Sequence, residues 1–147
     1  MRLASAEREG ALILGGVGIP DAALLSRVVD ICATQSLVLI DAPAYRPAQE
    51  LIKRADRIFV CANPDAAAAA ATVTLLTDLP DAHLVVSQAE ERDATTLAAL
   101  FGRPASFLIP RDEPSLRASL ARRGPAGGRL GRAYDVLAEV IGAEREQ

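Results

Sequence analysis

The run Leu37-Val38-Leu39-Ile40-Asp41 constrains the fold of this chain more than any other stretch. Four consecutive large aliphatic residues end in one carboxylate, and Ala42 and Pro43 follow directly. A continuous apolar run of this length, bounded by turn-forming residues, is typical of a strand buried on both faces of a parallel sheet. Asp41 is then expected at the carboxyl end of that strand, where open α/β sheets bind their ligands.

Four further apolar runs alternate with segments of helical periodicity. We predict strands over residues 11–14, 57–62, 83–87 and 106–110. Helices are expected over residues 21–33, 47–54, 65–79, 93–100, 114–122 and 129–143. This alternation predicts an α/β fold, with a three-layer, mostly parallel twisted sheet of about five strands and helices on both faces. We expect the 147 residues to form a single domain, with residues 1–10 as a lead-in and 144–147 as a tail.

Composition argues against several classes of function. Aromatic residues make up 3% of the chain, its net charge is −3, and Lys53 is its single lysine, so we expect no specific nucleic-acid binding. His83 is the single histidine, and Cys32 and Cys61 lack metal-ligand spacing, which predicts two reduced thiols. No stretch has the pattern of a signal peptide or the length of a membrane span, so a cytoplasmic protein is expected.

Four short motifs follow one another along the chain, and each occurs once. They are Leu37 to Pro43, Ala55 to Val60 followed by Asn63-Pro64-Asp65, Leu84 to Gln88, and Leu108 to Asp112 with Ala118 and Gly124-Pro125 beyond. In order and spacing they resemble the ParA/MinD-type deviant P-loop ATPases, especially their pilus-assembly relatives of the CpaE/TadZ kind and the septum-site-determining proteins. The resemblance covers roughly residues 35–143 and implies a P-loop NTPase-like fold.

The chain departs from this family at the phosphate-binding loop. A working P-loop needs a glycine-rich turn, a lysine and a Ser or Thr. Gly15, Gly16 and Gly18 are the candidate glycines, but Ile19 and Pro20 stand where the lysine and threonine are required, so the Walker A motif is not competent. Either the loop is degenerate, or the P-loop unit is missing and residues 11–20 correspond to the segment upstream of the Asp strand. We favour the second explanation because too few residues follow Gly18 for the strand and carboxylate that the family places there.

The resemblance nominates further site residues. In an intact relative, Asp41 would touch the magnesium shell or the attacking water, whereas here we expect it to hydrogen-bond the loop after its own strand. Ser87 stands near the family's adenine-reading asparagine, and Gln88 could partly replace that amide. Tyr45 and Arg46 occupy the loop of the family's nucleotide-sensing switch and are candidate partner contacts.

A cluster of basic residues late in the chain is a second candidate for partner binding. Its principal members are Arg111, Arg122 and Arg123, with Asp112 and Arg117 beside them. They form either a solvated helix face or a docking patch for a partner or an acidic surface.

These observations favour a non-catalytic protein, although they leave the question of enzymatic activity open. We expect a degenerate MinD/ParA-like positioning, assembly or regulatory factor that needs no cofactor. Its expected partners are other proteins, such as a second copy or a secretion, pilus or partitioning component. The alternative is an ATP-binding subunit that completes a Mg-ATP site with a partner chain.

A minor alternative is a receiver-like domain phosphorylated on Asp41. Receiver chemistry needs an acidic pair after the first strand and a lysine after the last one. Gly15-Gly16 and Ile109-Pro110 stand at these places, which argues against it.

Overall fold

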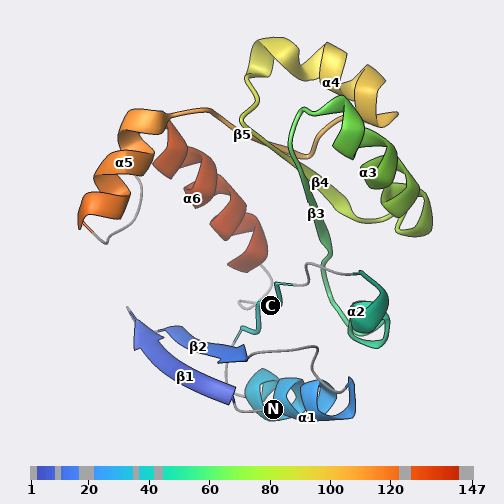
Figure 1. Ribbon diagram of the computed structural model, residues 1–147, viewed down its shortest axis with the longest axis vertical. Coiled ribbons are helices and arrows are strands. Elements are labelled where there is room, and N and C mark those ends of the chain that lie inside the picture. Colours follow the sequence, from blue (N-terminus) through green and yellow to red (C-terminus); the bar gives the residue numbers. More distant parts are fainter. Residues whose placement is uncertain are drawn as a thin grey trace. The chain divides into compact units, whose positions relative to one another are not determined.

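The structure is a computed structural model that describes residues 3–8, 11–16, 22–34, 37–41, 45–122 and 127–142 (Figure 1). Packing divides the chain into two compact units, Met1–Ala55 and Asp56–Gln147. The single domain expected from the sequence stays a prediction.

The first unit begins with an antiparallel strand pair. Strand β1 (Leu3–Arg8) pairs with β2 (Ala11–Gly16) in a register that sets Leu3 opposite Gly16 and Arg8 opposite Ala11. The strand expected over residues 11–14 is therefore present, but its partner is the segment for which we predicted only a lead-in. The pairing is antiparallel because the two strands follow each other directly, with two residues between them.

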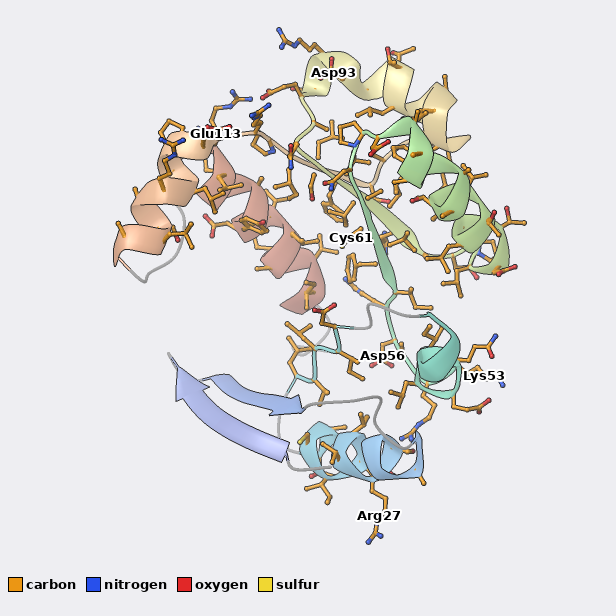
Figure 2. All side chains as sticks on the ribbon, in the orientation of Figure 1. Arg27, Lys53, Asp56, Cys61, Asp93 and Glu113 are labelled. Atoms are coloured by element: carbon orange, nitrogen blue, oxygen red, sulfur yellow. The ribbon has the colours of Figure 1, made fainter. Side chains whose placement is uncertain are left out.

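Two helices complete the first unit. Helix α1 (Ala22–Ala33) packs against α2 (Tyr45–Ile52), in which Leu51 is buried. The Arg54 guanidinium, which follows α2, donates to Ser26 Oγ on α1 at 2.5 Å and also binds the Asp30 carboxylate. Lys53, labelled beside α2 in Figure 2, pairs with Glu50 at 2.8 Å.

The strand predicted over Leu37–Asp41 is not formed. These residues have no strand pairing in the described part of the chain, and the Leu39 side chain is 71% exposed. An apolar run becomes a strand only where neighbouring strands take up its backbone hydrogen bonds, and here no ladder does so.

The second unit contains a three-stranded parallel sheet. Its strands are β3 (Phe59–Ala62), β4 (His83–Ser87) and β5 (Phe107–Ile109), in the order β3-β4-β5. The α/β class is confirmed. The single sheet of about five strands is wrong, since the strands of the described residues divide into this parallel sheet and the antiparallel pair.

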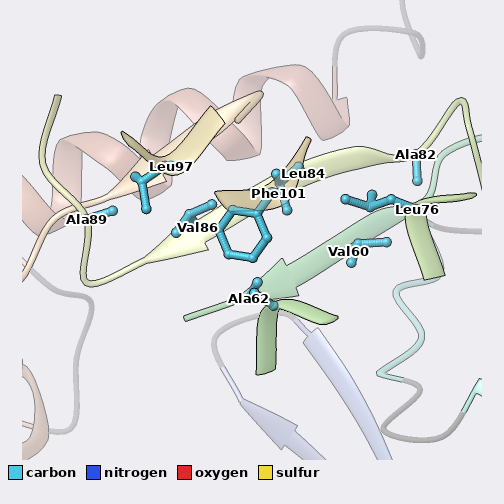
Figure 3. Packing of buried hydrophobic residues seen from close by; sticks show 10 residues of the cluster. Val60, Ala62, Leu76, Ala82, Leu84, Val86, Ala89, Leu97 and Phe101 are labelled. Carbon is cyan, nitrogen blue, oxygen red and sulfur yellow. The ribbon is translucent and has the colours of Figure 1, made fainter. Parts of the chain in front are cut away.

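Helices cover both faces of the parallel sheet. Helices α3 (Ala66–Asp78) and α4 (Ala94–Phe101) bury one face, where Leu76, Leu97 and Phe101 pack on Leu84 and Val86 (Figure 3). On the other face, α6 (Gly128–Gly142) packs its buried Leu130 against Val85 and Ile109. Arg57, which precedes β3, donates to the Val140 carbonyl near the end of α6. Helix α5 (Glu113–Arg122) contacts α6.

Local signals explain where these helices begin and end. Alanine has the highest helix propensity, and Asp65 caps the alanine-rich α3 by accepting from the Ala67 amide at 2.7 Å. Gly102, with φ +72°, ends α4 in the left-handed conformation that glycine favours. The short 3₁₀ helix η1 (Glu91–Asp93) precedes α4 and is closed by a capping box between Glu90 and Asp93.

Truncation of the central aromatic side chain tests this core. Phe101 is among the largest fully buried side chains, so we expect Phe101→Ala to lower the free energy of unfolding by about 3–5 kcal/mol. Urea denaturation followed by circular dichroism measures the loss. Val73→Ala, at an exposed position of α3, is the control and should cost less than about 1 kcal/mol. An equal loss in both variants would contradict the proposed core.

Candidate functional site

The candidate site is the carboxyl edge of the parallel sheet, the edge at which open α/β sheets bind ligands. Asn63 and Asp65 follow β3 there, Gln88 and Glu90 follow β4, and the segment 110–113 follows β5. Of the nucleotide ligands predicted from the sequence, Gln88 lies at this edge. Its side chain is exposed and its φ is +57°, a left-handed turn after which the Ala89 amide donates to the Ile109 carbonyl at 3.1 Å. A contact of Gln88 with adenine stays a prediction.

The other predicted nucleotide ligands belong to the first unit. Gly15 and Gly16 are the last two residues of β2, opposite Ala4 and Leu3, so their backbone belongs to a strand ladder and not to a strand–helix turn. Gly18 lies outside the described residues. Asp41 is exposed and does not follow a strand, which removes the geometry from which its role was predicted.

Asp112 joins the beginning of α5 to the beginning of α6. Its carboxylate accepts from Ser115 Oγ at 2.8 Å and from the Ser115 amide at 3.1 Å, and it also accepts from the Leu130 amide. The Ser115 hydroxyl, followed by the Ser115 amide, lowers the pKa of Asp112 below its ordinary value of 3.8. The Arg129 guanidinium contributes in the same direction.

Two neighbouring features close this α5–α6 junction. Arg129 forms an ion pair with Glu90, which ties the first turn of α6 to the turn after β4. Gly128 has φ +63°, and a Cβ built there would lie 2.9 Å from Ser115 Oγ and 3.3 Å from Asp112 Oδ2. The Asp112, Glu90 and Arg129 charges are thus satisfied within the chain. They hold the two helices and the turn after β4 together.

A second charged group lies on the outer side of α5. The carboxylate of Glu113, labelled in Figure 2, accepts from Arg111 Nη2 at 2.5 Å and lies 3.5 Å from Arg117 Nη2. One carboxylate therefore faces two guanidinium groups, and the group keeps a net charge of +1. An open depression of about 280 Å³ adjoins it, lined by Glu113, Pro114 and Arg117. This volume lies just below the range of about 300–1,000 Å³ that small-molecule pockets occupy.

Next to these charges, α5 exposes two leucines. Leu116 is 49% exposed and Leu120 is 69% exposed. They are four residues apart and therefore share one face of the helix. The half-buried Ser115 and Ser119 lie on a different face, which contains the junction with α6. We call Leu116, Leu120 and Arg117 the α5 outer face.

The residues predicted to contact a partner lie in different parts of the structure. Arg111 lies two residues before the beginning of α5. Arg122 is the last residue of this helix, and Arg123 lies outside the described residues. Tyr45 and Arg46 are the first residues of α2, so the prediction that they lie in a loop is wrong. A helix forms there because Pro47 stands within its first turn, where a missing amide hydrogen costs nothing.

The sequence interpretation missed the α5–α6 junction and the two leucines. Asp112 standing before Glu-Pro at a helix start was a readable N-cap signal. Its second contact, with the Leu130 amide, depends on tertiary packing. The leucines are visible in the sequence, but their exposure is not.

The described residues contain no metal-ligand cluster, no disulfide and no membrane-spanning helix. No group of three or more His, Cys, Asp or Glu side chains there is arranged to hold a metal ion. Cys32 and Cys61 form no disulfide. None of the helices in the described ranges is long and apolar enough to cross a bilayer.

No protein-family model, curated protein or solved structure matches the chain.

The lowered pKa of Asp112 predicts how the stability of the junction depends on pH. The ionised carboxylate stabilises the fold above pH 3.8, and this contribution is lost as the pH falls below that value through the folded-state pKa. Asp112→Asn should therefore lower the urea midpoint at about pH 7, and the difference from wild type should shrink towards about pH 3. Asp135→Asn, at an exposed position of α6, is the control. A difference that stays constant with pH would contradict the role of Asp112.

Gly128 provides an independent test of the junction. An alanine there meets both a left-handed backbone and the Ser115 hydroxyl, so Gly128→Ala should cost about 1–2 kcal/mol from the backbone alone. It should also increase hydrogen exchange of the α5 amides. Gly142→Ala is the matched control in the same helix, because its Cβ would meet nothing within 4 Å. Equal exchange in the two variants would show that Gly128 does not hold α5.

Proposed function

We propose that this chain is a non-catalytic, MinD/ParA-like positioning or assembly factor that acts by binding another protein through the α5 outer face. The observation that carries the proposal is the pair of exposed leucines, Leu116 and Leu120, on a helix fixed to the rest of its unit. The second, third and fourth of the sequence motifs support the family assignment, as do two of the predicted strands, which pair in parallel as β3 and β4.

Exposed leucines on one helix face favour a binding role on energetic grounds. Fully burying one leucine stabilises an assembly by about 1.5–3 kcal/mol, and these two leave 49% and 69% of their surface exposed. The arginine beside them, Arg117, belongs to a residue type that is enriched at protein interfaces.

The anchoring of α5 also supports binding. Its first turn is held by the hydrogen bonds of Asp112 with Ser115 and Leu130, and the Ser115 side of the helix is occupied by α6. A partner would therefore meet a helix that is already formed, and less conformational entropy is lost on binding.

Removal of the two leucines tests the proposal. The chain and its Leu116→Ser/Leu120→Ser variant are used to capture partners, and each captured protein is then purified and titrated calorimetrically. We expect the double variant to bind about ten- to a hundredfold more weakly, since partial burial of two leucines accounts for about 1.5–3 kcal/mol. Val73→Ser, at an exposed apolar position of α3, is the matched control and should bind as wild type does.

Two results would contradict this function. One is a partner whose affinity is the same for wild type and the double variant. The other is micromolar binding of Mg-ATP to the chain alone or to the complex with its partner, which would favour the composite ATP site instead.

A further inference from the structure

We infer that the partner presents an acidic amphipathic helix to the α5 outer face. This inference rests on the proposed function and adds the chemistry of the partner. It depends on the charges that border Leu116 and Leu120.

The border of the two leucines is positively charged. Arg117 lies directly after Leu116, five residues before the end of α5, and its side chain is 81% exposed. Arg117 Nη2 lies 3.5 Å from one carboxylate oxygen of Glu113. Arg111 Nη2 binds the other oxygen of the same carboxylate more closely, at 2.5 Å. Arg117 therefore keeps most of its charge for an external carboxylate.

The sequence extends this positive character along the helix. Residues 114–122 of α5 contain two arginines, at positions 117 and 122, and no aspartate or glutamate. A partner with acidic residues beside its apolar ones complements this segment, whereas a basic partner would be repelled.

The dimensions of the face favour a helix over other partners. Leu116 and Leu120 are separated by one helical turn, and a helix with leucines at positions i and i+4 matches that spacing. A membrane surface is less suitable, because membrane-binding helices present a broader apolar face than two half-exposed leucines.

Two labelled peptides test the inference by fluorescence anisotropy with the full chain. Each has about 15 residues, near the length at which isolated helices form, with leucines at i and i+4. One carries glutamate beside the leucines and the other carries lysine at the same positions. We expect the glutamate peptide to bind more tightly, with a preference that weakens as salt is added.

Variants of the chain locate the source of the preference. Arg117→Glu should reduce it about two- to tenfold, because an exposed charge pair contributes modestly and the reversal adds repulsion. Arg117→Lys should retain it. Arg27→Glu on α1, whose side chain is exposed (Figure 2), is the matched control and should behave as wild type. Leu116→Ser/Leu120→Ser should abolish binding of both peptides.

Several results would overturn the inference. These are equal binding of the two peptides, binding of neither, or an undiminished preference in Arg117→Glu. Co-sedimentation of wild type with phosphatidylserine vesicles, lost in the leucine variant, would assign the face to a membrane. If the peptides fail while a purified partner still depends on the leucines, the proposed function stands and only the acidic helix is wrong.

Discussion

The burial of β4 on both faces is the constraint on which the second unit depends. Leu84 and Val86 point to one side and are fully buried by α3 and α4, while Val85 points to the other side and is buried by α6. β4 is also the central strand, hydrogen-bonded to β3 and β5. A strand buried in this way can be neither exposed nor shifted by one residue without moving its apolar side chains to the wrong face. Three consecutive residues of one strand, Leu84 to Val86, therefore contact both helical layers.

From this strand the order of support runs outward to α5. Val85 and Ile109 pack against Leu130 and position it. The Leu130 amide in turn donates a hydrogen bond to the Asp112 carboxylate. Asp112 then fixes the first turn of α5 through Ser115. The α5 outer face thus lies at the end of a series of contacts that begins in the core. A loss of packing at α6 would therefore weaken the hydrogen bonds that hold α5.

The sequence predicts the parts of this fold that local chemistry determines. The strand over residues 83–87 was predicted with the bounds that the structure has, because its apolar residues are flanked by turn signals and its neighbours pair with it. The same rule failed for Leu37–Asp41, which has an equally apolar run but no pairing strand among the described residues. Apolarity predicts burial only when a partner surface exists, and one segment alone cannot reveal whether it does. The candidate site was less predictable still, since the second contact of Asp112 joins residues that are eighteen positions apart in the chain.

The glycine at the beginning of α6 indicates why α5 can remain solvent-exposed and still be ordered. A short helix with two leucines in solvent gains little from its own packing, and isolated helices of this length are marginal in water. Its order must come from the junction, where Gly128 leaves room for the Ser115 hydroxyl and Asp112 satisfies amides of both helices. The hydrogen bonds of the junction thereby replace the apolar contacts that α5 lacks. That arrangement leaves 49% of Leu116 and 69% of Leu120 exposed, which is the physical basis for proposing that a partner covers them.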